Sequence, residues 1–196
     1  MNDAGCLSGL PKWVGCIFAA MLMVSCGGKP QKKVDKYFSI PDFIDQQVEI
    51  LAENHNRLLK TVSFGDTSET TSIDSLSHEQ WEKELRIFKE HDINKPVLID
   101  AYLAQEINRP GGHTISYKLI DSTDSSILDM EILYDSEEQV SGWRSRFKEE
   151  NLLYCNFREL MLSTNEAGIL ESYLIKGYHK LIFKDTVHYQ VNVEIK

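Results

Sequence analysis

The nearest approach to a catalytic motif in this sequence of 196 residues is the run His78-Glu79-Gln80-Trp81-Glu82. Two histidines that lie one helical turn apart can bind a single zinc ion, and a glutamate between them can act as a general base. Here the position of the second histidine is taken by Glu82, so one of the two nitrogen ligands is missing. We therefore interpret this run as the first turn of a helix.

Other patterns that support chemistry are weaker. The polar segment 121–126 lacks the alternating acids and the glycine of a calcium-binding loop, and we interpret it as a turn. No G-x-S-x-G run, phosphate-binding glycine loop or C-x-x-C pair is present in the sequence. His55 and His179 fall on predicted apolar faces, where they could form either a metal or pH-sensitive pair or two ordinary core residues. The sequence thus predicts no catalytic residue, no metal ligand and no cofactor, and we expect a protein that is not an enzyme.

The first residues of the chain resemble an export signal. The apolar stretch from Trp13 to Ser25 is about thirteen residues long, whereas a transmembrane helix needs about twenty. A lysine, Lys12, precedes the stretch, and small residues follow it. This arrangement indicates a cleaved secretory signal peptide.

The end of that stretch, Met23-Val24-Ser25-Cys26, resembles the lipobox of bacterial lipoproteins. The resemblance covers the leader alone. It implies that the Cys26 sulfur receives a diacylglycerol, that the chain is cut before Cys26, and that the new amino terminus is acylated. Gly27 after the cysteine resembles lipoproteins that are sent to the outer membrane. The resemblance therefore implies a periplasm-facing protein of the cell envelope that is attached to a membrane by its lipid.

This processing divides the chain into a signal peptide (1–25), a lipidated cysteine with a basic tether (26–36) and a single globular domain (37–196). The tether spans at most about 35 Å when fully extended. Of the four cysteines, Cys155 alone remains as a free thiol after processing, so we expect no intramolecular disulfide. The formal net charge of −9 makes nucleic acid an improbable partner.

Two helices are expected at the start of the domain. The first begins at Ser39, a helix-capping residue, and its apolar positions continue from Ile44 to Leu58 and Val62. A polar loop is expected over 67–77. The second helix begins near Ser77, which forms a capping-box pattern with Gln80, and ends before Pro96.

From residue 97 onward the apolar pattern alternates with a period of two, which predicts strands. The sequence predicts an α+β fold in which the N-terminal helices pack on the concave face of a curved, half-barrel-like antiparallel meander of about seven strands. In the last hairpin, a loop over 184–186 would pair Phe183 with Val187 and Leu181 with Tyr189. The expected strands are 97–108, 113–121, 127–135, 139–149, 152–163, 168–183 and 187–195.

Aromatic residues are the remaining candidates for a binding site. They could line an apolar cavity between the helices and the sheet, or they could simply fill the core. We carry two hypotheses forward: a non-enzymatic domain that binds an envelope protein or supports an envelope assembly, and a carrier or sensor of an apolar ligand or lipid. The candidate residues are Trp81, Phe88, Tyr117, Tyr134, Tyr173, Phe183 and Tyr189.

Overall fold

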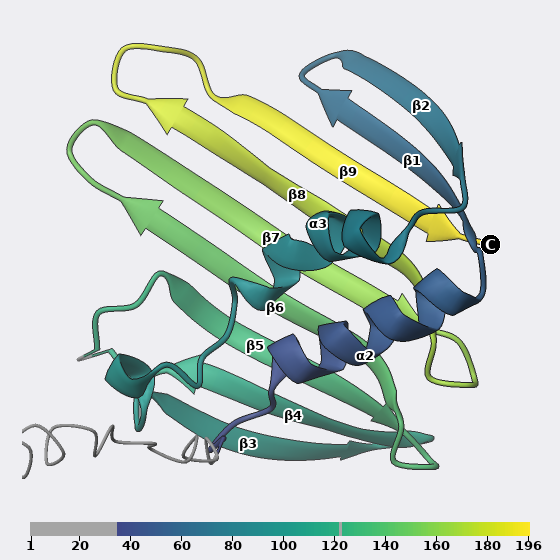
Figure 1. Cartoon of the computed structure of the whole chain (residues 1–196). Helices are drawn as coiled ribbons and strands as arrows, with labels where there is room; N and C mark the ends of the chain where they lie inside the picture. Colours follow the sequence, from purple (N-terminus) through teal and green to yellow (C-terminus); the bar gives the residue numbers. More distant parts are fainter. Residues whose placement is uncertain (1–34, 122) are drawn as a thin grey trace, which may run out of the picture. The chain divides into compact units, whose positions relative to one another are not determined.

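Two α-helices lie across one face of an open antiparallel sheet in the computed structural model, which describes residues 35–121 and 123–196 (Figure 1). The predicted signal peptide, Cys26 and most of the tether lie outside the described residues. Residues 35–196 form one compact unit. The predicted α+β class is confirmed.

Helix α2 (Ile40–Glu53) begins as predicted, because the Ser39 hydroxyl accepts a hydrogen bond from the Asp42 amide. Its buried face includes Ile44 and Val48. The predicted continuation to Leu58 and Val62 is wrong. The turn at 54–56 interrupts the helix, and strand β1 (Arg57–Phe64) follows it. Leu58 and Val62 satisfy helical spacing by coincidence, since positions four apart also share a face of a strand.

Strand β2 (Thr67–Asp74) occupies the segment that was predicted to be a loop, so that prediction is also wrong. All eight of its residues are exposed, and it pairs with β1 from Phe64–Thr67 to Arg57–Asp74. Because both faces of β2 are exposed to solvent, its sequence lacks the alternation of apolar and polar residues that would predict a strand. Backbone pairing with β1 and the threonines' β-propensity account for its extended form.

Helix α3 (His78–Lys89) begins with the predicted capping box. The Ser77 hydroxyl accepts from the Gln80 amide at 3.3 Å, and the Gln80 side chain accepts from the Ser77 amide at 2.8 Å. His78 is therefore the first residue of a helix, as expected. The helix ends at Lys89, and Pro96 begins the short 3₁₀ helix η2 (Pro96–Leu98).

Nine strands form one sheet in the order β2-β1-β9-β8-β7-β6-β5-β4-β3, so β2 and β3 are its edges. The seven strands expected after residue 97 are confirmed, with bounds that differ by a few residues, and the β1–β2 hairpin extends the sheet. The C-terminal strand lies between β1 and β8, which joins the early hairpin to the meander. The seven strands are β3 (Tyr102–Arg109), β4 (Gly112–Leu119), β5 (Ile127–Asp135), β6 (Val140–Glu150), β7 (Tyr154–Thr164), β8 (Leu170–Leu181) and β9 (Val187–Ile195).

The predicted register of the last hairpin is wrong. Tyr189 pairs with Gly177, not Leu181, and the connection occupies 182–186. The shift is an even number of residues, so the prediction of which residues share a face is unaffected. Its consequence is that Phe183, expected in the sheet, lies at an exposed hairpin tip.

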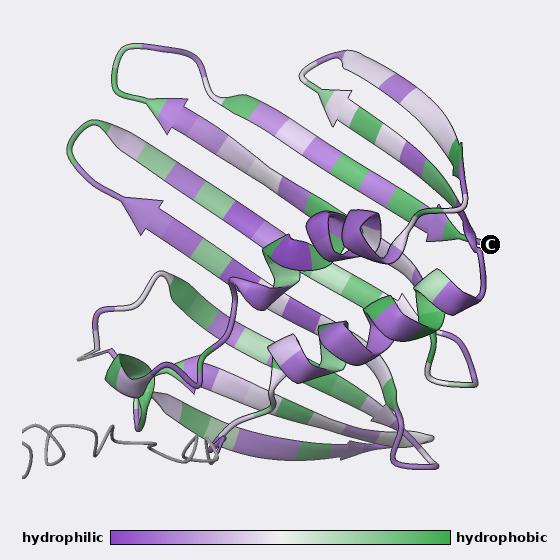
Figure 2. Ribbon diagram, in the orientation of Figure 1, coloured by the Kyte–Doolittle hydropathy of each residue, from purple (hydrophilic) through white to green (hydrophobic). Residues whose placement is uncertain are grey.

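The core fills the space between the helices and the sheet. Figure 2 shows the alternation of hydrophobic and hydrophilic residues along the strands. The Phe88 ring of α3 packs edge-on against Tyr173 of β8 at 5.4 Å and against Trp143 of β6 at 5.8 Å between ring centroids. These contacts fix α3 to the centre of the sheet. No helix of residues 35–121 and 123–196 covers the other face, here named the helix-free face.

Candidate functional site: a hollow on the helix-free face

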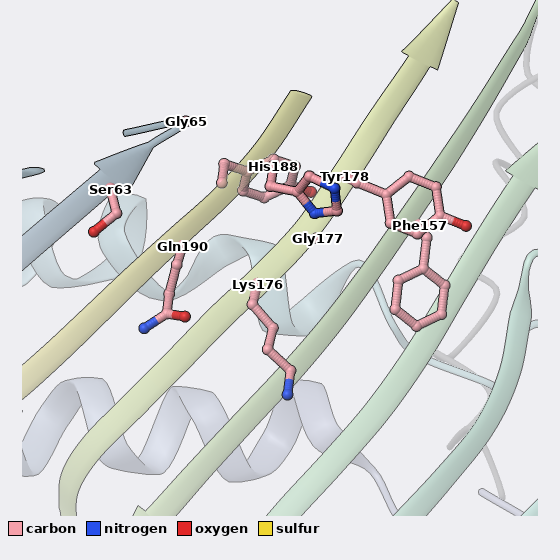
Figure 3. A pocket seen from close by; sticks show the side chains of 9 residues that line it. Ser63, Gly65, Phe157, Lys176, Gly177, Tyr178, His188 and Gln190 are labelled. Carbon is pink, nitrogen blue, oxygen red and sulfur yellow. The ribbon is translucent and has the colours of Figure 1, made fainter. Parts of the chain in front are cut away.

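The face of the sheet opposite the helices carries a hollow of about 390 Å³ (Figure 3). The hollow spans strands β7, β8 and β9 and the end of β1. Its volume is within the range of about 300–1,000 Å³ that small-ligand sites occupy. The lining residues are Ser63, Gly65, Phe157, Lys176, Gly177, Tyr178, His188, Tyr189 and Gln190.

The alternation of side chains along β8 places this hollow away from the helices. The Tyr173 hydroxyl donates to Glu84 of α3, so Tyr173 lies on the helix side of the sheet. Lys176 and Tyr178 are an odd number of residues farther along the strand and therefore point to the opposite face. Their cross-strand partners Gln190 and His188 lie on that face too.

Three rings on neighbouring strands form one wall of the hollow. Phe157 and Tyr178 are stacked, with ring centroids 5.5 Å apart and planes at 20°. His188 lies 5.8 Å beyond Tyr178, with its plane tilted by 50°. Phe157 and Tyr178 are half-buried and His188 is exposed, so the edges of this aromatic row are open to a ligand.

Gly177 separates the two faces at the floor of the hollow. A Cβ atom at this position would lie 2.2 Å from the Phe157 carbonyl oxygen and 2.7 Å from the Tyr189 hydroxyl. The Tyr189 side chain, on the helix side, therefore occupies the space over the glycine. Packing of an aromatic ring over a cross-strand glycine compensates for the missing side chain.

A network of charges borders the hollow on the side away from β9. Glu159 is buried and accepts from Lys176 at 3.0 Å and from Arg144 at 2.5 Å. Burial alone would raise the pKa of Glu159, but these two cations outweigh it and hold the pKa below its usual value. Glu159 therefore remains ionised at neutral pH and orients Lys176.

The site combines apolar rings with a few hydrogen-bonding groups. Lys176 keeps an ammonium group at the wall of the hollow, and Gln190 and Ser63 supply an amide and a hydroxyl. Stacked rings can receive an apolar or aromatic group, while the ammonium can bind a carboxylate or a carbonyl oxygen. The arrangement is suited to binding.

The cysteine expected to be the one free thiol lies next to this row. Cys155 is half-buried, and its sulfur lies 3.9 Å from the Tyr178 hydroxyl. This hydrogen bond and partial burial raise the pKa of Tyr178. The Tyr178 hydroxyl therefore stays protonated at neutral pH and contributes a hydrogen-bonding group to the edge of the hollow.

The aromatic residues predicted from the sequence are dispersed. Trp81, Phe88, Tyr117 and Tyr173 are buried in the core, where they pack against other side chains. Tyr134 stacks on His113 at 4.7 Å near the far end of the sheet. Phe183 lies at a hairpin tip, and Tyr189 alone borders the hollow.

Tyr189 is the one lining residue of the hollow that the sequence analysis named as a candidate for binding. Phe157, Lys176 and Tyr178 lie on strands whose alternation is clear, so their common face could have been inferred. That they are neighbours depends on the pairing of β7 with β8, which places Phe157 opposite Tyr178. Because the predicted register of the last hairpin was wrong, the pairing of His188 with Tyr178 was not expected.

His55 and His179 do not meet. Leu58, near His55, pairs with Ile195 at the end of β9, whereas His179 pairs with Val187 at its start. Eight residues of extended strand separate these positions by about 26 Å. Within residues 35–121 and 123–196, no three His, Cys, Asp or Glu side chains are grouped so as to hold a metal ion.

Comparisons of the chain with protein-family models, curated proteins and solved structures gave no match. In the described part of the chain, no helix has both the length and the apolar character needed to cross a membrane.

Proposed function

We propose that this protein is a lipid-anchored, non-enzymatic protein of the bacterial cell envelope whose domain binds a partner protein through the helix-free face of its sheet. The anchor is Cys26 within Met23-Val24-Ser25-Cys26, and the domain faces the periplasm from the outer membrane. Cleavage before Cys26 leaves a tether that permits the domain to turn toward a partner.

The observation that carries this proposal is the aromatic hollow beside Lys176. Protein interfaces concentrate their binding energy in aromatic and basic residues that line pockets excluded from water. Phe157 and Tyr178 provide such a surface, and Lys176 can pair with an acid or a carbonyl group of the partner. We expect the partner to insert an apolar or aromatic side chain between the ring edges of this row.

The test is capture of envelope proteins from detergent-solubilised membranes with the full-length lipidated protein. Tyr178→Ala is expected to lose the specifically captured protein, because it removes the central ring of the row. The matched control is Asn192→Ala, an exposed residue on the same face of β9 that does not line the hollow.

Thermal unfolding must first show that the two variants are equally folded. Capture of the same proteins in equal amounts by wild type, Tyr178→Ala and Asn192→Ala would contradict a role for the hollow in binding a partner.

The volume of the hollow favours a second candidate function, the carriage or sensing of a small apolar ligand or lipid. In this version the ligand occupies the hollow on the helix-free face, and the domain acts in the manner of half-barrel lipoproteins that handle lipidated cargo. Native mass spectrometry of the purified protein would then detect a bound lipid. We expect Tyr178→Ala to lose that lipid and Asn192→Ala to keep it.

A further inference from the structure

The two most exposed large apolar side chains of the described residues, Leu152 and Phe183, lie at the tips of two neighbouring hairpins. Leu152 and Leu153 form the tip of β6–β7, with exposed fractions of 91% and 66%. Ile182 and Phe183 begin the β8–β9 connection, with exposed fractions of 56% and 91%. The Ile182 amide donates to the Leu153 carbonyl at 3.0 Å, so the two tips form one surface, here named the hairpin tips. Figure 2 shows the β6–β7 tip and the first part of the β8–β9 connection as hydrophobic.

The exposed apolar residues are concentrated at one end of the sheet. The antiparallel pairing brings the start of β3, the hairpin tips and the end of β1 to this end (Figure 1). The connections at the opposite end, such as 54–56, 136–139 and 165–168, consist mainly of polar residues. The exposed large hydrophobic residues at the apolar end are Phe64, Val97, Ile99, Leu103, Leu152, Leu153, Leu181, Ile182 and Phe183.

The described chain also begins at the apolar end. Lys36 forms an ion pair with Asp100, which precedes β3. The Tyr37 hydroxyl accepts from the Tyr102 amide at 3.3 Å, and the Tyr37 amide donates to the Asn94 side chain at 2.9 Å. These contacts fix the point where the tether joins the domain to the same end of the sheet as the hairpin tips.

We propose that the hairpin tips dock into the surface of the lipid bilayer that carries the anchor. This inference rests on the proposed lipidation of Cys26. A tether of about 35 Å at most keeps the domain near that bilayer, and the resulting high effective concentration permits weak contacts to form. Large exposed apolar patches mark interaction surfaces, and here the attached membrane is the nearest apolar phase.

The two hairpins carry apolar residues at their tips and lysines beside one tip, an order that fits the acyl chains and the head groups of a bilayer surface. Leu152 and Phe183 are the most exposed of these side chains. Lys180 and Lys184 flank the β8–β9 tip and are exposed. Lysine can bury its methylene groups against lipid while its ammonium reaches the head groups. The described residues Asp121 and 123–126, which join β4 to β5 at the same end, are polar, so insertion is limited to the tips.

Docking by the tips would orient the domain. The polar connections at the opposite end would point away from the bilayer. The aromatic hollow, which lies on a flat side of the sheet, would then face sideways, where a partner in the periplasm can reach it. Docking and partner binding therefore use different surfaces of the same domain.

The test uses full-length lipidated protein on vesicles of phosphatidylethanolamine and phosphatidylglycerol. An environment-sensitive fluorophore is attached at Leu152→Cys or at Phe183→Cys in a Cys155→Ala background. The matched control carries it at Ser136→Cys, an exposed site in the polar turn at the opposite end. Thermal unfolding verifies that each labelled variant is folded, and vesicle flotation reports the anchor independently.

At Leu152→Cys and Phe183→Cys we expect the emission to shift to the blue and to be quenched by brominated lipids, and at Ser136→Cys we expect no change. Protein that floats with the vesicles but gives the same unquenched emission at all three sites would overturn docking while leaving the anchor intact. The tips would then be assigned to a protein partner. Failure to float would overturn the anchor, and the docking inference with it.

Discussion

At the scale of single residues, His91 is the buried group whose ionisation the fold opposes most clearly. Its side chain is 1% exposed and packs against the rings of Trp143 and Phe147. The Ser145 hydroxyl donates to the Asp129 carbonyl at 3.0 Å, so it must accept from His91 Nδ1 at 2.9 Å. His91 is therefore neutral, with its hydrogen on Nδ1, and its Nε2 atom has no hydrogen-bond partner among the described residues.

This histidine predicts a pH dependence of stability. Burial, with smaller effects from Arg158 and Lys95, lowers the pKa of His91 from 6.5 to about 3. Below pH 6.5 the unfolded chain binds a proton that the folded chain rejects, so the free energy of unfolding falls as the pH drops toward 3. The slope from this group approaches about 1.4 kcal/mol per pH unit.

The measurement is urea unfolding of wild type and His91→Gln between pH 7 and pH 5, above the range in which Glu159 takes up its proton. The free energy of unfolding of the wild type should fall by about 2 kcal/mol over this interval, because the slope approaches about 1.4 kcal/mol per pH unit. The variant should lose less. Equal slopes for the two proteins would show that His91 is not held neutral by the fold.

A second prediction at this scale concerns Gly177. Gly177→Ala should lower the free energy of unfolding by about 1–3 kcal/mol, because the new methyl group would collide with the Phe157 carbonyl and the Tyr189 hydroxyl. Urea unfolding measures the change, with the exposed Asn192→Ala on β9 as the control. A Gly177→Ala variant as stable as wild type would mean that Tyr189 moves aside freely.

At the scale of elements, Gln47 ties helix α2 to the β7–β8 turn. Its side chain donates to the Gly168 carbonyl at 3.0 Å and accepts from the Leu170 amide at 2.8 Å. The Gln47 side chain is buried, the bond to the Leu170 amide is buried, and the bond to the Gly168 carbonyl is partly buried. This one side chain thus satisfies two polar groups of the turn and fixes the helix above it.

Gln47→Met should therefore reduce the free energy of unfolding by about 2–4 kcal/mol, since it keeps the volume and removes the hydrogen bonds to the Leu170 amide and the Gly168 carbonyl. The neighbouring Gln46 is exposed, and Gln46→Met should change the stability by no more than about 0.5 kcal/mol. Chemical unfolding of the two variants gives the comparison. Similar losses in both would contradict the tie between helix and turn.

Elements with a clear local signal could be predicted from the sequence. The capping box at Ser77 fixed the start of α3, and period-two alternation located the seven strands of the meander. The β1–β2 hairpin was missed because Thr67–Asp74 is polar on both faces and because Leu58 and Val62 imitate a helix. The alternation of apolar and polar residues shows which side chains share a face of a strand. It does not show which residues of two strands pair, because the pairing depends on the length of the connecting loop. The β8–β9 loop is longer than expected, and Phe183 therefore lies at the tip of the hairpin.

The candidate site was less accessible to prediction. Aromatic residues predicted from their type alone fell mostly in the core, because burial of rings is the commonest outcome in a folded domain. The hollow depends on which strands are neighbours, because the pairing of β7 with β8 and of β8 with β9 brings Phe157, Tyr178 and His188 together. This pairing is a property of tertiary structure.

At the scale of the whole molecule, the proposed protein has a lipid anchor and a domain with one apolar end and a free sheet face. Cys26→Ala should release the protein from membranes, because a multiply acylated cysteine holds far more strongly than the hairpin tips could alone. Fractionation of cells that express the variant or the wild type measures this. A variant that still sediments with membranes would point to another means of attachment.

The most direct test of the central claim is the intact mass of the protein purified from membranes, together with analysis of its first residue. We predict that the chain begins at Cys26 and carries a diacylglycerol on its sulfur and an acyl group on its amino terminus. A chain that begins at Met1, or an unmodified thiol at Cys26, would contradict the anchor and with it the placement of the domain in the cell envelope.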